Sequence, residues 1–396
     1  MRSIHPFPAR MAPDTVADYL KKLPHGSRIM DPMCGSGVVL RQSALLGHSV
    51  KGFDIDPLAV LMSRVWTRKG RHASVCDIAR KLVIRAEKLQ NFKHTDLNWV
   101  AHCNETTQFI EYWFAEPQRS QLARLTKLIS NLSKTEENWI CDVLKLALSR
   151  IIVTKQAGAS LAWDVSHSRP HRVRDENDFD VYAGFLKAAN QIVNHLDSET
   201  LPRGGHVESG DCRQLDSVKS NSVDFIITSP PYLNAIDYLR GHKLSLVWIG
   251  YTIPQLRALR SNSVGTENTR GSRKSIDLEN LERSVRSIAN LPPRQRAIVH
   301  KYAEDAELIL CEMSRILCKH GEILLVLGDS NVRGIPVYNS KIFRHVAEGI
   351  GFTLTNERKR PLQSNRRYLP ITDSSGALAR RMRTEVLQTY RFSESA

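Results

Sequence analysis

A glycine turn between a short strand and a helix constrains the fold of this chain more than any other feature. Residues 28–31 are predicted to form an apolar strand, and the sequence Gly-Ser-Gly follows at 35–37. The segment 38–46 then has the composition of a helix. A second strand over 50–53 ends at Asp54, so this part of the chain predicts a β-loop-α-β unit of the doubly wound type.

The other predicted strands come much later in the chain. Residues 206–209 precede Asp211, residues 223–228 precede the sequence Ser-Pro-Pro-Tyr, and residues 322–327 precede Gly-Asp. A helix over 304–317 leads into the last of them. Because strands alternate with helical segments, we predict an α/β fold with a mostly parallel, doubly wound sheet.

Two long segments interrupt this predicted sheet. Residues 66–203 have helical periodicity, and they far exceed the dozen or so residues that a parallel crossover needs. Residues 233–300 form a second excursion, which is rich in Ser, Asn and Arg. We therefore expect a core over 1–65 and 204–396, with a large helical insertion between the second and third strands.

Composition narrows the class of partner. The chain of 396 residues has a net charge of +15, the sign expected of a protein that meets phosphates. Its seven cysteines form no C-x-x-C pair, which argues against a metal site or a disulfide framework. It has no run of about 18 apolar residues that would span a membrane, and its first residues lack the apolar core of a secretory signal. We therefore expect an intracellular, cytoplasmic protein without a bound metal.

The glycine turn suits a cationic ligand that carries a ribose. Asp31 ends the first strand, and Gly35 and Gly37 let the backbone approach a ligand closely. The third glycine of a dinucleotide-binding G-x-G-x-x-G would fall at position 40, which is Leu40, and this disfavours a pyrophosphate ligand. S-adenosylmethionine has a sulfonium, an ammonium and a ribose diol, and Asp54 can accept the two diol hydroxyls. A glycine turn with only a structural role would have the same sequence.

The second chemical signal is Ser229-Pro230-Pro231-Tyr232, at the end of an apolar strand. Two successive prolines fix φ and remove two amide donors. The Ser229 oxygen and the Pro230 carbonyl can then accept both protons of an exocyclic amino group, while Tyr232 stacks on the base. Because this biases the amino nitrogen toward sp³, its lone pair becomes available to an electrophilic methyl group, and transfer would be a direct in-line displacement.

Three sequence motifs together resemble one family. DPMCGSG at 31–37, TSPPY at 228–232 and HPFPAR at 5–10 resemble the amino-methylating DNA methyltransferases, especially the cytosine-N4 group. The resemblance implies the Rossmann-like class I methyltransferase fold, S-adenosylmethionine as cofactor, and site-specific methylation of cytosine N4 in duplex DNA after base flipping. Adenine-N6 methylation, RNA-base methylation and a catalytically silent nucleic-acid-binding subunit stay open as alternatives. A cognate restriction endonuclease as a partner also stays open.

The resemblance assigns roles by position, with Asp54 at the ribose and Asp211 near the adenine amino group. The residues expected to be catalytic are Ser229, Pro230, Pro231 and Tyr232. The residues expected to bind the cofactor are Phe7, Pro8, Asp31, Pro32, Cys34, Gly35, Gly37, Asp54, Ile55, Asp211 and Cys212.

Basic segments are candidate contacts to nucleic acid. Residues 240–300 hold eleven Lys or Arg against four acids, directly after the Ser-Pro-Pro-Tyr turn, where a strand that extrudes a base needs phosphate contacts. A solvated helix face would have the same composition. The helical insertion 66–203 is the other candidate for target recognition, so the element that reads the DNA sequence stays open. The candidate contacts are Arg169, Arg172, Arg257, Arg260, Arg270, Arg273, Lys274, Arg366 and Arg367.

Overall fold

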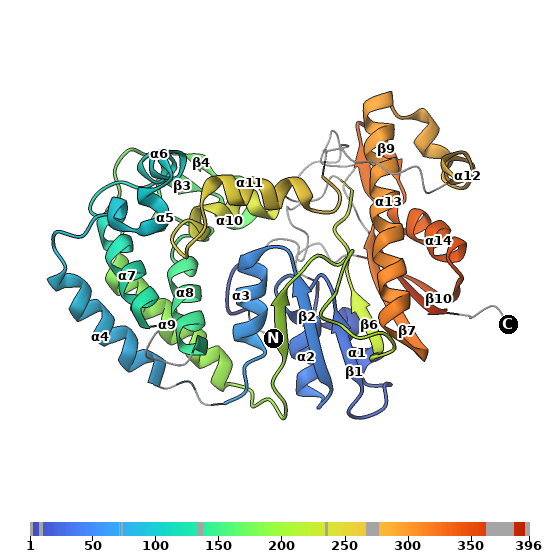
Figure 1. The fold of residues 1–396 in the computed structure, drawn as a ribbon, viewed down its shortest axis with the longest axis horizontal. Helices are drawn as coiled ribbons and strands as arrows, with labels where there is room; N and C mark the ends of the chain where they lie inside the picture. The colour runs from blue at the N-terminus through green and yellow to red at the C-terminus, as the bar shows by residue number, and fades with distance from the viewer. Residues whose placement is uncertain are drawn as a thin grey trace.

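The computed structural model describes residues 3–7, 11–70, 72, 74–132, 138–233, 237–266, 277–361 and 384–392. Its centre is a seven-stranded sheet with the order β10-β11-β7-β6-β1-β2-β5 (Figure 1). Neighbouring strands are parallel from β5 through β7, and β11 runs antiparallel to β7 and β10. The strands are β1 (Arg28–Asp31), β2 (Ser49–Asp54), β5 (His206–Ser209), β6 (Val223–Thr228), β7 (Leu317–Gly328), β10 (Phe352–Pro361) and β11 (Thr384–Phe392).

Helices cover both faces of this sheet. Successive residues of β1 point to opposite faces, so Ile29 belongs to the same hydrophobic cluster as residues of α1 and α2. Met30 belongs to the cluster that includes residues of α13 and α14. The covering helices are α1 (Asp14–Leu20), α2 (Val38–Leu45), α3 (Pro57–Trp66), α13 (Pro293–Ile316) and α14 (Asn339–Gly349).

The mostly parallel, doubly wound sheet predicted from the sequence is confirmed. The predicted strands 28–31, 206–209 and 223–228 coincide with β1, β5 and β6. Two differences occur near the C-terminal half. Helix α13 begins at Pro293, inside the segment assigned to the basic insertion, because proline is well suited to the first turn of a helix. Strands β10 and β11 were not predicted, since the charged sequence of β10 at 356–360 lacks the apolar pattern of a core strand.

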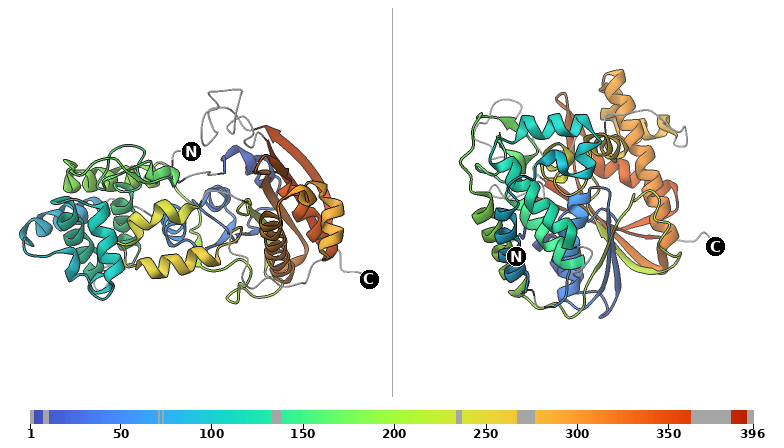
Figure 2. Two further views of the ribbon diagram at one scale, coloured as in Figure 1. Left: turned by 90° about the horizontal axis from the view of Figure 1, so that it is seen from above. Right: turned by 60° about the vertical axis from the view of Figure 1, so that its left-hand side comes forward.

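A large helical insertion lies between β2 and β5, as predicted, and forms one end of the molecule (Figure 2). Its buried side chains form one hydrophobic cluster that also includes residues of α3 and of the helices after β6, α10 (Tyr238–Leu246) and α11 (Ile253–Asn262). The insertion contains α4 (Ser74–Lys88), η1 (His94–Asp96), α5 (Asn98–Ala101), α6 (Asn104–Trp113), α7 (Gln118–Leu132), α8 (Asn138–Arg150), β3 (Ala162–Trp163), η2 (Val165–His167), β4 (His171–Arg172) and α9 (Val181–Asp197).

The remaining elements lie beside α13 and after β7. They are α12 (Leu278–Ser284), η3 (Arg286–Asn290), β8 (Ser330–Val332) and β9 (Ile335–Val337). Within the described ranges, none of the helices combines the length and the apolar character needed to cross a membrane.

Candidate active site

The two predicted turns follow neighbouring strands. β1 pairs with β6 in parallel, with Ile29 opposite Phe225 and Met30 opposite Ile226, so the turns after these strands begin at the same edge of the sheet. The strand order also reverses here, because β2 and β5 extend to one side of β1 while β6 and β7 lie on the other. Open α/β sheets bind ligands at such a switch point. The structure therefore brings the glycine turn and the Ser-Pro-Pro-Tyr turn together, as predicted.

The glycine turn is held against strand β2 and helix α3. Gly35 and Gly37 have φ of +49° and +78°, a region that glycine adopts without strain. The Ser63 hydroxyl of α3 donates to the Gly35 carbonyl at 2.9 Å. The Cys34 amide donates to the Phe53 carbonyl of β2 at 2.8 Å. These bonds fix the turn from both sides and leave the Gly35 backbone partly exposed.

Phe7 lies over the glycine turn. A Cβ atom built on Gly35 would lie only 3.3 Å from the Phe7 ring, so the absence of a side chain lets the ring lie close over the turn. The Phe7 ring stacks on Tyr238, with ring centroids 4.9 Å apart and planes at 16°. Tyr238 begins α10, the first described helix after the Ser-Pro-Pro-Tyr turn. Phe7 therefore lies near both turns. Pro8, the other residue expected to cover the cofactor, lies outside the described residues.

Two carboxyl groups at this edge, those of Asp31 and Asp54, form no ion pair with a lysine or arginine of the described part of the chain. Asp54 accepts hydrogen bonds from the amides of Gly35 at 2.8 Å and Asp56 at 2.9 Å, and Asp31 accepts one from the Met33 amide at 3.2 Å. Desolvation raises the pKa of Asp31 and of Asp54 to about 7, and the Asp56 carboxylate adds to the shift at Asp54. Two weakly solvated acids with free lone pairs are suited to a positively charged ligand.

Ser229 presents acceptor lone pairs to the site. Its hydroxyl donates to the Val326 carbonyl of β7 at 2.9 Å, and the Tyr232 hydroxyl oxygen lies 3.2 Å from Ser229 Oγ. Because the Ser229 proton is directed at Val326, the Ser229 oxygen can accept a hydrogen bond from another group. Tyr232 is half-buried, and desolvation raises the pKa of its hydroxyl, so it stays protonated at neutral pH.

The carbonyls of the proline pair differ in their partners. The Pro231 carbonyl accepts a hydrogen bond from the buried Tyr302 hydroxyl at 2.9 Å. The Pro230 carbonyl accepts none from the described residues. The Ser330 hydroxyl holds the next part of the turn by donating to the Leu233 carbonyl at 2.6 Å. The turn is thus anchored at 231 and 233, and it leaves the Pro230 carbonyl as a second acceptor beside Ser229.

The remaining predicted cofactor residues occupy different surroundings. Cys34 and Cys212 belong to hydrophobic clusters, and burial raises the pKa of both thiols. Their side chains therefore pack in the core, which leaves their backbone as the part that a ligand at this edge can contact. Pro32 is buried and Ile55 is half-buried.

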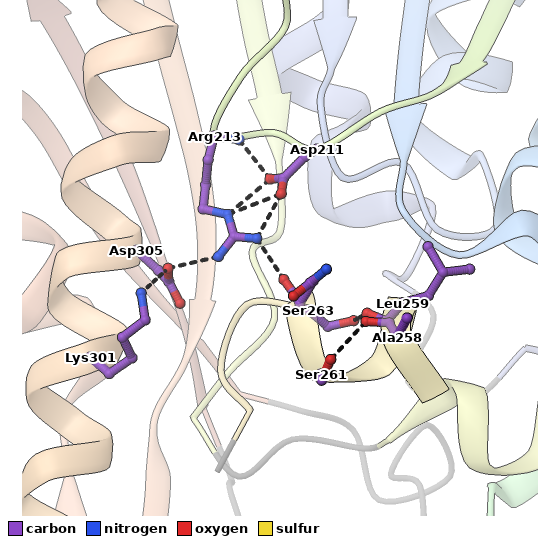
Figure 3. Close-up of polar contacts among 9 residues, drawn as sticks. Asp211, Arg213, Ala258, Leu259, Ser261, Ser263, Lys301 and Asp305 are labelled. Atoms are coloured by element: carbon purple, nitrogen blue, oxygen red, sulfur yellow. Dashed lines mark hydrogen bonds and ion pairs between the residues drawn. The ribbon is translucent and has the colours of Figure 1, made fainter. Parts of the chain in front are cut away.

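Asp211 has a partner that the sequence analysis missed. Asp211 follows β5, and Arg213 donates to both of its carboxylate oxygens, with Nε 2.9 Å from Oδ1 and Nη2 2.6 Å from Oδ2 (Figure 3). In the sequence, an arginine stands two positions after an aspartate at a predicted strand end. That spacing alone does not predict the ion pair, because the position of Arg213 also depends on contacts with helices that are distant in sequence.

A second unpredicted pair joins α10 to α3. Nδ1 of the buried His242 lies 2.5 Å from Oδ2 of Asp56, while Oδ1 of Asp56 accepts the Leu58 amide at 2.9 Å and caps α3. The His242 ring also lies beside Phe7, with centroids 5.5 Å apart. This pair fixes the helix after the Ser-Pro-Pro-Tyr turn relative to the glycine turn.

The described basic candidates are exposed and mostly paired. Arg260 pairs with Asp237 at 2.6 Å, and Arg257 pairs with Glu105 of α6. Burial and the neighbouring charges of Arg260, Arg240 and Arg257 lower the pKa of Lys243, so these four cations form one cluster on α10 and α11.

The other candidates lie elsewhere. Arg169 is exposed near the hairpin β3-β4. Arg172 pairs with Asp175 and lies over the Tyr112 ring. No group of three or more His, Cys, Asp or Glu in the described part of the chain could hold a metal ion. The candidates outside the described residues are Arg270, Arg273, Lys274, Arg366 and Arg367.

The strand order, the antiparallel β11 and the turn after β1 define the Rossmann-like class I methyltransferase fold. In sequence, the chain is similar to type II methyltransferases. M.AvaI of Nostoc sp. is 25% identical over 367 residues, which cover 83% of this chain and 73% of that protein. M.BsoBI of Geobacillus stearothermophilus is 24% identical over 267 residues, which cover 60% of this chain and only 50% of that protein. M.MvaI of Kocuria varians is 20% identical over 358 residues, which cover 84% and 78% of the two chains.

No protein-family model matches the chain. Among solved structures, a methyltransferase of Methanosarcina mazei that depends on S-adenosylmethionine covers 95% of this chain and 98% of its own at 8% identity, with a TM-score of 0.33. The chain is thus similar in sequence to type II methyltransferases at 20 to 25% identity.

Proposed function

We propose that this protein transfers a methyl group from S-adenosylmethionine to the N4 amino group of cytosine in duplex DNA. One observation carries the proposal: the glycine turn and the Ser-Pro-Pro-Tyr turn follow the adjacent parallel strands β1 and β6, at the switch point of the sheet. The similarity to type II methyltransferases supports the same activity. The serine in Ser-Pro-Pro-Tyr, as in the cytosine-N4 group, favours cytosine over adenine.

The residues at this edge fit the proposed cofactor. Phe7 lies close over Gly35, where a Cβ would crowd its ring, and the carboxyl groups of Asp31 and Asp54 form no ion pair with a lysine or arginine of the described residues. Asp31 would face the charged methionine end, Asp54 the ribose hydroxyls and Asp211 the adenine amino group. The strands that carry these acids follow one another along the edge as β1, β2 and β5, so the adenine would lie farthest from β6. The bound cofactor supplies an electrophilic methyl group on its sulfonium.

The Ser-Pro-Pro-Tyr turn would prepare the target amine. The amino lone pair of cytosine is delocalised into the ring, so it is a poor nucleophile. Ser229 Oγ and the Pro230 carbonyl accept its two N–H bonds, which shifts the nitrogen toward sp³ and directs its lone pair at the methyl donor. Tyr232 stacks on the extruded base. Positioning by these fixed acceptors is the main contribution of the protein, because no covalent intermediate is needed.

Transfer of a labelled methyl group tests this function directly. Purified protein with methyl-labelled S-adenosylmethionine is expected to label duplex DNA of mixed sequence and to leave tRNA and rRNA unlabelled. Label in tRNA or rRNA would favour the RNA alternative. Tight DNA binding without any label would favour the silent binding subunit.

Raising the pH from about 6 to about 8 is expected to strengthen cofactor binding. The pKa of Asp31 and of Asp54 is raised to about 7, so both groups ionise in this range. Ionised Asp31 attracts the charged methionine end, and ionised Asp54 accepts hydrogen bonds from the ribose hydroxyls more strongly than its protonated form does. For the protein alone the sign is opposite. Between about pH 4 and pH 7 the folded state binds more protons than the unfolded state, so these two groups lower the stability as the pH rises.

Calorimetric titration of S-adenosylmethionine at several pH values checks this expectation. Asp31→Asn should flatten the pH dependence, and the titration of the ligand's own amine is common to both proteins. An affinity in the wild-type protein that stays level or falls across the range would contradict the roles given to the two acids.

Neutralising Arg257 and Arg260, the two members of the basic cluster that lie on α11, is expected to flatten the salt dependence of DNA binding. If Arg257 and Arg260 each neutralise one phosphate, the variant with both changed to Gln should reduce the slope of log affinity against log salt by about 1 to 2. The measurement is DNA binding by fluorescence anisotropy over a salt series.

Arg344→Gln is the matched control for this measurement. Arg344 is an exposed arginine that is also paired with an acid, Glu348, but it lies on α14. A slope in the α11 variant equal to that of the control would remove this cluster from the DNA interface.

A further inference from the structure

Arg213 joins three elements of the fold at one point (Figure 3). Its Nε and Nη2 donate to the two carboxylate oxygens of Asp211, after β5. Its Nη1 donates to Asp305 of α13 at 2.8 Å. Its Nη2 also donates to the carbonyl of Asn262, the last residue of α11, at 2.5 Å. The guanidinium thus connects the loop after β5 to two helices that are distant in sequence.

The contacts of Arg213 leave it little capacity to bind a ligand. Four of the five guanidinium N–H donors are used by Asp211, Asp305 and Asn262. Its side chain is only 18% exposed. Lys301 adds a second cation, which donates to Asp305 at 2.8 Å, so two cations face two carboxylates. A saturated, neutralised network of this kind positions groups and does not compete for a phosphate.

The paired hydrogen bonds from Arg213 Nε and Nη2 to Asp211, here called the fork, fix the plane of the Asp211 carboxylate. A bidentate pair between arginine and a carboxylate holds both groups in one plane, and the Arg213 amide also donates to Asp211 Oδ1 at 3.0 Å. Asp211 remains 35% exposed. Its Oδ1 already accepts from Arg213 Nε and from the Arg213 amide, so Oδ2, whose short bond comes from Nη2, is the oxygen with a lone pair left for a ligand. The carboxylate is therefore held in one orientation and can still accept from a ligand.

The same guanidinium lies at the C-terminal end of α11. The last carbonyls of a helix carry partial negative charge, which a cation stabilises. Without Arg213, Lys301 would be the one cation of this network left to face two carboxylates and this helix end. The orientation of Asp211 therefore depends on the helix that carries Arg257 and Arg260.

We propose that Arg213 is a positioning residue that holds Asp211 in the orientation that accepts the amino group of the cofactor's adenine. The inference rests on the proposed function, because it takes S-adenosylmethionine as the ligand. Arg213 acts through Asp211 and contacts neither substrate.

The test compares two probes that differ at the adenine amino group. S-adenosylhomocysteine has this amino group, whereas S-inosylhomocysteine has a carbonyl oxygen at the same place, which repels a carboxylate. A hydrogen bond to a charged group contributes enough that wild-type protein should prefer the adenine compound by roughly 10- to 100-fold. Calorimetric titration measures this preference for each protein.

Arg213→Gln is expected to lower the preference to about threefold or less, mainly because it weakens the binding of S-adenosylhomocysteine. Arg213→Lys should behave like Arg213→Gln, because lysine keeps the charge but cannot form the fork. Arg315→Gln is the matched control. Arg315 donates to the Leu215 and Val218 carbonyls and to Glu312, so it anchors the same loop to α13 without touching Asp211. Its variant should keep the wild-type preference.

Three outcomes overturn the inference. An undiminished preference in Arg213→Gln shows that Arg213 does not orient Asp211. An equal loss in Arg315→Gln shows a general effect of loosening the loop. If the wild-type protein binds neither compound, the proposed function fails and the inference fails with it. Retained affinity for S-inosylhomocysteine in Arg213→Gln shows that the variant is folded and that a lost preference is specific.

Discussion

Replacing Ser229 with alanine is expected to lower the rate of methyl transfer by roughly 100-fold, the scale of losing one preorganised polar contact to a reacting group. The Ser229 oxygen faces the target amine, while its proton is used by the Val326 carbonyl. Because Ser229 is expected to contact the target base and not the cofactor, the affinity for S-adenosylmethionine should stay within about twofold of the wild-type value. Single-turnover transfer with saturating DNA and calorimetric titration of the cofactor measure the two quantities.

Ser330→Ala is the matched control for Ser229→Ala. Both serines donate to a main-chain carbonyl near the same turn, Ser229 to Val326 and Ser330 to Leu233. Ser229 Oγ also bonds the Tyr232 hydroxyl and Ser330 Oγ also accepts from Asn339, so each variant loses two hydrogen bonds and about 1 to 3 kcal/mol of stability. Only Ser229→Ala should strongly lower the rate of methyl transfer. A large loss of cofactor affinity in Ser229→Ala, or equal rate losses in both variants, would contradict the assignment.

Replacing Gly35 with leucine is expected to have the opposite pattern. A side chain at this position enters the space in front of the Phe7 ring, since even its Cβ would lie 3.3 Å from that ring. Overpacking of a close contact costs about 1 to 3 kcal/mol, so the affinity for S-adenosylmethionine should fall by roughly 10- to 100-fold. Saturating cofactor should restore much of the rate, because the Ser-Pro-Pro-Tyr turn is unchanged. Cofactor titration and the rate at high cofactor concentration check both parts.

Gly26→Leu separates backbone strain from obstruction. Gly26 also has a positive φ, +76°, but a Cβ there would meet no atom within 4 Å. Both variants should lose about 1 to 2 kcal/mol of stability from the left-handed backbone. The cofactor affinity should fall only in Gly35→Leu. Equal affinities in the two variants would mean that the glycine turn does not face the cofactor.

The core of the sheet could be predicted because its signals are local. The strand before Gly35, the helix after Gly37 and the strand ending at Asp54 each have a composition that stands out within about ten residues. Strands β10 and β11 gave no such signal. β10 is mostly exposed along its length and, among the described strands, pairs with β11 alone, so polar side chains suffice there.

The site was predictable only where chemistry is encoded in contiguous residues. The turns at 31–37 and 228–232 fit this description, and parallel pairing of β1 with β6 brings them together. The pair of His242 with Asp56 and the contacts of Arg213 with Asp305 and Asn262 join residues far apart in sequence. No spacing rule reveals such partners, because they depend on how the helices pack.

The identity of the methylated base is the most direct test of the role proposed for the Ser-Pro-Pro-Tyr turn. Duplex DNA incubated with the protein and S-adenosylmethionine can be digested to nucleosides and analysed by mass spectrometry against authentic standards. N4-methylcytosine is the expected product with the wild-type protein, and it should disappear with Ser229→Ala. N6-methyladenine as the product, or DNA that carries no new methyl group, would contradict that role.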